Sequence, residues 1–246
     1  MSKRCLQLDV GNSAAKWRYC EGGSVVTRGQ CDLDDLATML HCTQRLDAIW
    51  ISSVAGPEKE AALSGALVER WHVEPWYART AAKTAGFTNS YQDPSRMGVD
   101  RWLAMLGART RYRGNLCVID AGSAVTIDLV SADGQHAGGY ILPGPTLMER
   151  ALLLDTDRVR FEEDLVYNLT PGRSTAEAVR HGVALALVGA VELALARLGD
   201  PDVQLVFSGG AGEVLMDLLG RGGRWHPDLV FDGLEIMAAE RASSKA

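Results

Sequence analysis

Two short stretches of the chain combine an acid, a glycine and small polar residues directly after an apolar run. The first is DVGNSAAK, residues 9–16, and the second is DAGS, residues 120–123. The N–H groups of a glycine turn can donate to a phosphate at close range, because glycine has no Cβ to hold the ligand away. An aspartate nearby can hold the hydrated Mg²⁺ that accompanies a nucleotide, and a lysine can neutralise charge. The residue types therefore indicate polyphosphate binding.

Either turn alone is also typical of an ordinary hairpin, and it is the repetition that favours the phosphate interpretation. The two aspartates, Asp9 and Asp120, lie about one small domain apart in the sequence, and each turn leads into a returning strand. We therefore predict two similar α/β domains, residues 1–112 and 113–246, with a nucleotide cleft between them. A third glycine turn, SGGAG at residues 208–212, fits a contact with the nucleoside or a plain strand-to-helix turn.

Hydrophobic periodicity and turn residues predict the elements that position these turns. Strands are expected before and after each turn, and further strands at residues 46–55 and 136–144. Asp32 is a candidate N-cap, and Pro57 is a candidate first residue of a helix. The predicted helices are residues 32–43, 57–71, 100–112, 145–156, 174–199 and 213–220.

Composition narrows the class of protein. The net charge of −6 and the pI near 5.4 argue against a general nucleic-acid binder, which usually carries a basic field. Five scattered cysteines without a CxxC pair indicate neither a zinc site nor a disulfide framework, so we expect reduced thiols in a cytoplasmic protein. The apolar run at residues 183–198 is too short to span a bilayer and contains Glu192. It predicts a buried helix and no membrane partner.

Six motifs occur in order over nearly the whole chain: DVGNSAAK, PSRMGVDRW, DAGSAVTID, GGYILPG, STAEAVRHG and SGGAG. Together they resemble the type III pantothenate kinase family of the actin, sugar-kinase and heat-shock-ATPase superfamily. The resemblance implies two duplicated RNase H-like domains and a homodimer. It implies transfer of the ATP γ-phosphate to pantothenate, the first step of coenzyme A biosynthesis. It also implies Mg²⁺ with the ATP, and K⁺ or NH₄⁺ as a monovalent cation.

The resemblance assigns the two repeated turns to ATP and its ions. Asp9 would stand near Mg²⁺, largely through water, and Asp120 would hold the monovalent cation. The Ser123 hydroxyl would contact a phosphate; the family usually has Thr at this position, and the hydroxyl is retained. The residues that would line the ATP in the first motif are Asp9, Val10, Gly11, Asn12, Ser13, Ala14, Ala15 and Lys16.

The motif GVDR matches the family's pantothenate site. Its residues are Gly98, Val99, Asp100 and Arg101. Asp100 would be the general base that accepts the proton of the substrate hydroxyl. Arg101 suits the pantothenate carboxylate. Without the resemblance, Asp100 is a carboxylate placed against a helix dipole, and Arg101 is part of a surface salt bridge.

Two further residues match substrate contacts of the family. Tyr91 lies in an irregular region, and its alternative is a half-buried core tyrosine. Thr175 begins the long predicted helix, and its alternative is an N-cap. Both roles of Thr175 are compatible with one another.

Two other functions stay open at this level. The first is a kinase of the same fold that acts on a sugar or another small alcohol. The second is a nucleotide-binding regulator without catalysis, because some relatives are described as transcription accessory factors. The presence of Asp9, Asp100 and Asp120 favours an enzyme.

Overall fold

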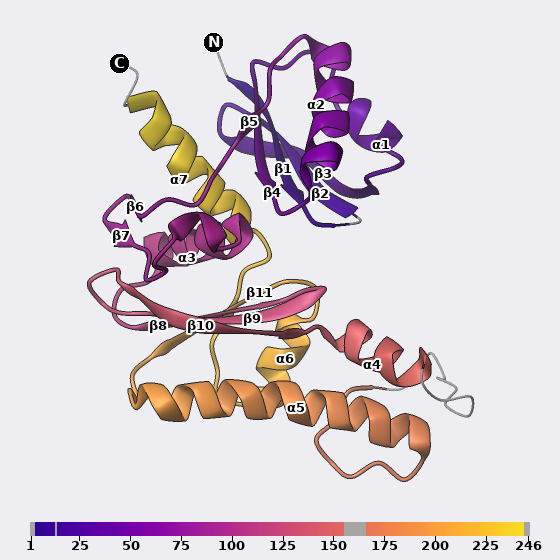
Figure 1. The fold of residues 1–246 in the computed structure, drawn as a ribbon, viewed down its shortest axis with the longest axis vertical. Coiled ribbons are helices and arrows are strands. Elements are labelled where there is room, and N and C mark those ends of the chain that lie inside the picture. Colours follow the sequence, from indigo (N-terminus) through magenta and orange to yellow (C-terminus); the bar gives the residue numbers. More distant parts are fainter. Residues whose placement is uncertain (1–2, 13, 155–165, 244–246) are drawn as a thin grey trace. The chain divides into compact units, whose positions relative to one another are not determined.

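A computed structural model of the chain describes residues 3–12, 14–154 and 166–243. The chain packs into two compact units (Figure 1). The first unit combines residues 1–107 with residues 230–246, and the second is formed by residues 108–229. The last helix therefore packs with the N-terminal strands. The predicted division into residues 1–112 and 113–246 instead assigns this helix to the second domain.

The first unit is built on a five-stranded mixed sheet with the order β3-β2-β1-β4-β5. β1, β2 and β3 form an antiparallel meander, and β4 and β5 continue the sheet in parallel with β1. Gly22 and Gly23 make the turn between β2 and β3 at positive φ. The strands are β1 (Arg4–Val10), β2 (Ala14–Glu21), β3 (Ser24–Asp32), β4 (Ala48–Ser53) and β5 (Trp76–Tyr77).

One face of this sheet is apolar and is covered by α1 (Ala37–Leu40) and α2 (Pro57–Trp71) (Figure 1). Alternate residues of the central strands, such as Leu6 and Leu8, are fully buried against the helices. α2 begins at Pro57 as predicted, and it ends where His72 adopts a left-handed conformation. This apolar layer fixes the two central strands, β1 and β4, side by side.

The helix predicted over residues 32–43 is wrong in its start and its length. β3 continues through Asp32, which pairs with Ala14 of β2. The carboxylate that accepts at the start of α1 belongs to Asp35, which receives the N–H of Ala37 at 3.1 Å. Pairing with β2 supplies hydrogen-bond partners for the backbone N–H and C=O groups of residues 24–32. A short isolated helix would gain little stability of its own.

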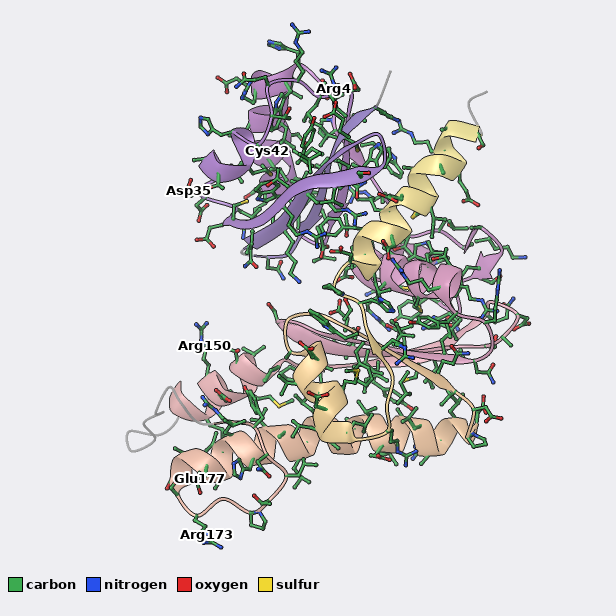
Figure 2. All side chains as sticks on the ribbon, turned by 180° about the vertical axis from the view of Figure 1, so that it is seen from behind. Arg4, Asp35, Cys42, Arg150, Arg173 and Glu177 are labelled. Carbon is green, nitrogen blue, oxygen red and sulfur yellow. The ribbon has the colours of Figure 1, made fainter. Side chains whose placement is uncertain are left out.

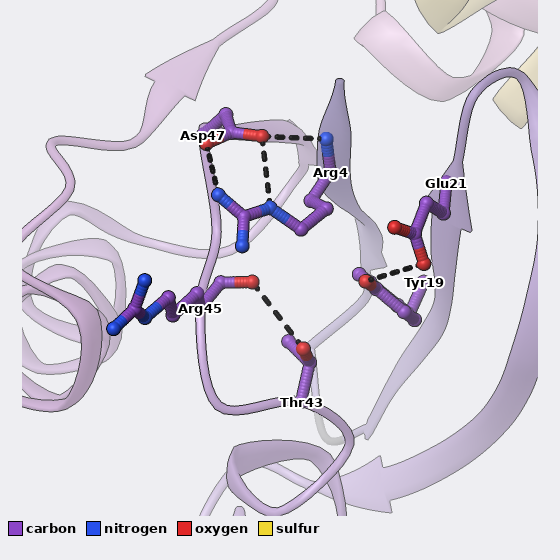
Figure 3. A network of polar contacts seen from close by, with 6 residues as sticks. All are labelled: Arg4, Tyr19, Glu21, Thr43, Arg45 and Asp47. Atoms are coloured by element: carbon purple, nitrogen blue, oxygen red, sulfur yellow. Dashed lines mark hydrogen bonds and ion pairs between the residues drawn. The ribbon is translucent and has the colours of Figure 1, made fainter. Parts of the chain in front are cut away.

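An ion pair joins the start of β1 to the residue just before β4 at one end of the sheet (Figure 3). The Asp47 carboxylate accepts from the backbone N and Nε of Arg4 at 2.8 and 3.0 Å, and from its Nη2 at 2.7 Å. These hydrogen bonds lower the pKa of Asp47 to about 2. In the parallel register of β1 and β4, the opposite ends of the strands bring Asp9 beside Ser52.

The other face of the sheet is polar and binds α7 (Leu229–Ser243). Arg18 donates from Nε to Gln7 at 2.8 Å and from Nη2 to Glu235 of α7 at 3.0 Å. Gly233 of α7 lies against the backbone of α3 (Val99–Arg111), because a Cβ there would come within 2.6 Å of the Leu103 carbonyl carbon. The remaining elements are β6 (Lys83–Thr84), β7 (Phe87–Thr88) and the 3₁₀ turn Pro94–Arg96.

The second unit repeats the strand pattern of the first, with the sheet order β10-β9-β8-β11-β12. Again three strands form an antiparallel meander, and two more continue in parallel with its first strand. The duplication predicted from the two turns therefore extends to whole sheets. The strands are β8 (Leu116–Ala121), β9 (Ala124–Val130), β10 (His136–Pro143), β11 (Gln204–Ser208) and β12 (Arg224–Trp225).

Three helices belong to the described part of the second unit: α4 (Pro145–Leu154), α5 (Thr175–Leu198) and α6 (Gly212–Leu219). Among the described helices, α5 alone is long and apolar enough, by length and composition, to cross a membrane. Its buried residues, among them Val191 and Leu195, pack with Ile119 and Ile127 of the sheet. This packing accounts for one side of the helix as a core face, whereas Leu185 and Leu193 on the same helix are exposed.

Candidate functional site

The first repeated turn lies between β1 and β2. Asp9 is half-buried one residue before the end of β1, and its register partners are Lys16 on β2 and Ser52 on β4. The N–H of Gly11 donates to the carbonyl of Ala14 at 3.0 Å and closes the hairpin. Ser13 lies outside the described residues. The turn therefore gathers a carboxylate, an exposed lysine and glycine backbone at one strand end.

A second lysine reaches this turn, and the sequence analysis missed it. Nζ of Lys59, in the first turn of α2, donates to the carbonyl of Asn12. The only local signal is a lysine among acids after Pro57, which reads as an ordinary helix surface. Lys16 and Lys59 therefore both lie on segments that form or contact the turn. Their two positive charges favour an anionic ligand there.

The second repeated turn has the same construction in the second unit. Asp120 lies one residue before the end of β8, with Thr126 on β9 and Ser208 on β11 as its register partners. The N–H of Gly122 donates to the carbonyl of Ala124 at 2.9 Å. This turn is one residue shorter than the first, which accounts for the absence of a counterpart to Ser13.

Glycines from two other motifs pack on the second turn. The N–H of Gly144, in GGYILPG, donates to the carbonyl of Ser123 at 3.0 Å, and a Cβ on Gly144 would lie 2.6 Å from that same oxygen. Gly209, in SGGAG, has φ +80°, and its Cβ would lie 2.5 Å from Oδ1 of Asp120. Both positions require glycine, because a side chain there would collide with the turn or with its carboxylate. The predicted nucleoside contact of SGGAG stays a prediction.

Both turns suit cations held together with phosphates. The described residues contain no group of three or more His, Cys, Asp or Glu side chains that could cage a metal ion. Mg²⁺ bound to a nucleotide needs only one or two carboxylates, because phosphate and water oxygens supply its other ligands. The half-buried carboxylate of Asp9 is a ligand of this kind, and Asp120 offers a carboxylate at the equivalent strand end of the second unit.

The GVDR motif forms the start of α3. Asp100 lies in the first helical turn, where its Oδ1 accepts the N–H of Arg101 at 2.8 Å. A Cβ on Gly98 would lie 2.5 Å from that same Oδ1. Glycine is therefore the residue that lets the Asp100 carboxylate fold back over the start of the helix.

Arg101 and Tyr91 are in direct contact. The Arg101 side chain is buried, and its Nη1 donates to the Tyr91 hydroxyl at 2.9 Å. Its guanidinium carbon also lies 5.8 Å from the centre of the Tyr91 ring. The alternative of a surface salt bridge for Arg101 is therefore wrong. The structure brings Tyr91, Asp100 and Arg101 together from two segments of the chain.

A cavity of about 410 Å³ lies within the first unit beside this motif. It is formed where β4 ends and α3 begins, and small ligands bind at such carboxyl ends of parallel strands in α/β proteins. Arg79 and Arg96, which are not among the predicted site residues, contribute to its wall. The lining residues are Ser53, Val54, Arg79, Thr80, Ser95, Arg96, Met97, Gly98 and Val99.

Thr175 is the first residue of α5 and is not its N-cap. That position belongs to Ser174, whose Oγ accepts the N–H of Glu177 at 3.2 Å. The Glu177 carboxylate in turn accepts the N–H of Arg173 at 2.6 Å. Figure 2 shows Arg173 on the segment before α5 and Glu177 on the first turn of the helix. Thr175 instead lines an apolar cavity of about 620 Å³ between α4 and α5. Its contact with substrate stays a prediction.

Comparison with known proteins agrees with these features. The family model for type III pantothenate kinase matches residues 5–197. The type III pantothenate kinase of Pseudomonas aeruginosa (strain LESB58) is 40% identical over 243 residues, which cover 94% of this chain and 97% of that protein.

Two solved structures share the fold. A Campylobacter jejuni protein described as a Baf family transcriptional activator matches with a TM-score of 0.60 at 21% identity, covering 97% of this chain and 99% of its own. MreB 5 of Spiroplasma citri, bound to AMPPNP, matches with a TM-score of 0.54 at 9% identity, covering 99% of each chain. The predicted α/β fold of the actin-like ATPases is confirmed, and the structure adds that each of its two main sheets is mixed and five-stranded.

Proposed function

This chain belongs to the type III pantothenate kinase family, which phosphorylates pantothenate in coenzyme A biosynthesis, and we propose which of its residues carry that reaction. The observation that carries the proposal is the placement of the Asp100 carboxylate against Gly98, a residue that lines the cavity where β4 ends. Substrate would enter this cavity with its primary hydroxyl directed to Asp100.

Asp100 acts as the general base. The primary hydroxyl of pantothenate is a poor nucleophile, and a carboxylate within hydrogen-bond reach orients it and accepts its proton as the bond to phosphorus forms. The N–H of Arg101 already holds one oxygen of this carboxylate at 2.8 Å. The base is thereby oriented before substrate arrives, which reduces the reorganisation that the reaction requires.

Arg101 and Tyr91 orient the substrate. The buried guanidinium of Arg101 holds the Tyr91 hydroxyl at 2.9 Å and supplies positive charge for the pantothenate carboxylate. Gly98 and Val99 contribute to the wall of the cavity. Thr175, which begins α5, is the further substrate contact that the family's pattern suggests.

The two turns bind the phosphates of ATP. The backbone from Asp9 to Lys16 and the Ser123 hydroxyl supply donors, and Lys16 supplies charge. Mg²⁺, when bound with ATP beside Asp9, neutralises charge on the phosphates. Asp120 supplies the carboxylate for a monovalent cation, K⁺ or NH₄⁺. Positioning and charge stabilisation then account for most of the rate, because phosphoryl transfer asks little covalent chemistry of the protein.

The compartment and the assembly complete the proposal. All five cysteines are free thiols, and burial raises the pKa of the Cys5 thiol and the Cys117 thiol to about 12. Such thiols suit a reducing cytoplasm. We also propose a homodimer, which sedimentation equilibrium at micromolar protein tests directly: a single species at 26.5 kDa would rule it out.

The test is ADP release by the purified protein with Mg²⁺ and ATP, with and without pantothenate, in K⁺ and in Na⁺. We expect release that depends on pantothenate and K⁺, and that falls about 100-fold or more in Asp100→Asn. Release stimulated by a sugar or another small alcohol and not by pantothenate would contradict the substrate. Full activity in Asp100→Asn would remove Asp100 from the role of base.

A further inference from the structure

A buried serine contacts the aspartate of the first turn, and neither the sequence motifs nor the family pattern singled it out. Ser52 is the fifth residue of β4 and is fully buried. Its Oγ donates to Oδ1 of Asp9 at 3.1 Å. The two residues are direct register partners in the parallel pair β1 and β4. The contact therefore follows from strand pairing and is rebuilt whenever the sheet forms.

Packing alone does not explain a serine here. Ile49 and Ile51 of β4 point to the opposite face and pack in the apolar core, whereas Ser52 lies on the face that carries Asp9 and Gln7. A buried hydroxyl costs free energy unless it is hydrogen-bonded, and the Asp9 carboxylate supplies that partner. The hydroxyl has a use if its partner carboxylate must point in a fixed direction.

The second unit repeats the arrangement. Ser208 ends β11, is buried, and is the register partner of Asp120 in the parallel pair β8 and β11. Ser52 and Ser208 thus occupy the same position in two sheets of the same order. In each unit, the strand parallel to the aspartate strand presents a small polar residue beside the carboxylate.

We propose that Ser52 is a positioning residue that holds the Asp9 carboxylate in the orientation needed for Mg²⁺·ATP. The hydroxyl occupies one carboxylate oxygen and thereby fixes the direction of the other. A group that orients a metal-associated carboxylate commonly changes metal affinity about 10- to 100-fold when it is removed. This inference rests on the proposed role of Asp9 and goes beyond it by naming the residue that orients it.

Two substitutions separate the effect of the Ser52 hydrogen bond from the effect of its side-chain volume. Ser52→Ala removes the hydroxyl. Ser52→Cys keeps nearly the same volume and replaces a good donor by a weak one. The matched control is Ser64→Ala, which removes another hydroxyl contact of the first unit, with the Tyr77 hydroxyl at 2.8 Å, away from the turn. Circular dichroism and thermal melts establish that each variant folds.

The decisive measurement is the Mg²⁺ dependence of ATP binding by titration calorimetry, which requires no turnover. We expect Ser52→Ala and Ser52→Cys to raise the half-saturating Mg²⁺ concentration about tenfold, with the KM for pantothenate within about twofold of wild type. Ser64→Ala should match wild type in both. A residue with a purely structural role would not raise the half-saturating Mg²⁺ concentration while it leaves the KM for pantothenate unchanged.

Each result decides the inference separately from the catalytic proposal. A wild-type Mg²⁺ response in folded Ser52→Ala or Ser52→Cys would overturn the role of Ser52, as would an equal change in Ser64→Ala. If the wild type shows no pantothenate-dependent turnover, the catalytic proposal fails, and the calorimetric comparison still decides whether Ser52 orients Asp9. Absence of any Mg²⁺ effect on ATP binding in the wild type would overturn the inference.

Discussion

The Cβ position of Gly98 lies 2.5 Å from Oδ1 of Asp100, closer than any side-chain carbon can approach an oxygen. The position of the Asp100 carboxylate therefore depends on glycine at position 98. The carboxylate occupies the space that a side chain at position 98 would take. Substitution of Gly98 must move either the start of α3 or the carboxylate itself.

The first prediction follows from this contact. Gly98→Ala should lower kcat about 10- to 100-fold, because a displacement near 1 Å of a catalytic group costs rates of this order. The affinity for Mg²⁺·ATP should stay close to that of the wild type. The measurement is steady-state ADP release together with calorimetric ATP binding.

Gly65→Ala is the matched control for this prediction. Gly65 is an exposed residue of α2 with no atom within 4 Å of its Cβ position. Alanine there should leave activity unchanged and slightly favour the helix. A fully active Gly98→Ala would show that the Asp100 carboxylate is not held where the reaction needs it.

The second prediction concerns the pair of Arg101 and Tyr91. Arg101→Lys keeps the charge and loses the planar fork that bonds the Tyr91 hydroxyl. The KM for pantothenate should rise about tenfold or more, the effect of one lost hydrogen bond to a charged group. Tyr91→Phe should raise KM as well, and the double variant should show less than the sum of the two effects.

The exposed Arg45→Lys serves as the control for charge and fold in the first unit. It should leave the KM unchanged. Additive effects of the Arg101 and Tyr91 substitutions would contradict a shared role, and an unchanged KM in Arg101→Lys would remove Arg101 from recognition of the substrate carboxylate.

The third prediction concerns pH and the ion pair of Arg4 and Asp47. The hydrogen bonds from Arg4 lower the pKa of Asp47 from 3.8 to about 2. A lowered pKa in the folded state contributes stability that is present above pH 3.8 and is lost as the pH falls towards 2. Asp47→Asn should therefore unfold at a slightly lower temperature than the wild type at pH 7, and the difference should shrink as the pH falls through this window.

Salt provides the check on this third prediction. Both side chains are partly exposed, so the attraction is screened by added salt. The difference in melting temperature at pH 7 should decrease in 0.5 M NaCl, a concentration that shortens the Debye length to roughly half its physiological value. A difference that grows below pH 3 would contradict the sign of the pKa shift.

The sequence predicted those parts of the site that depend on local pattern. Asp9 and Asp120 stand at strand ends because an apolar run followed by a glycine turn is a local signal. Pro57 marks the start of α2 for the same reason. The resemblance then supplied Asp100 and Arg101, whose roles composition and spacing do not reveal.

The rest depended on contacts between distant segments. Ser52 gives no signal in an apolar strand, and only its register with Asp9 shows its use. The bond from Gln7 to Glu235 joins residues 228 positions apart, and nothing in the sequence of α7 announces that it packs on the first sheet. Asp32 was predicted to cap a helix, because aspartate is a common N-cap residue. In the structure it ends β3 opposite Ala14, and its residue type alone does not distinguish the two positions.

The fourth prediction concerns Gly144 and the second turn. A Cβ at this position would lie 2.6 Å from the carbonyl oxygen of Ser123, which is backbone and cannot swing aside. Gly144→Ala must therefore shift the turn that carries the Ser123 hydroxyl. The expected result is a rise of about tenfold in the K⁺ concentration needed for half-maximal activity, since the turn that contains Asp120 moves with it. K⁺ titration of pantothenate-dependent ADP release measures this.

The control is Gly189→Ala in α5, where no atom lies within 4 Å of the Cβ position and the residue is exposed. It should leave the K⁺ response unchanged and the helix as stable or more so. If Gly144→Ala lost activity equally at all K⁺ concentrations while its melting temperature fell, the glycine would serve the fold alone. A shift in the K⁺ response at an unchanged melting temperature instead ties the GGYILPG motif to the cation, because a purely structural defect would not be relieved by more K⁺.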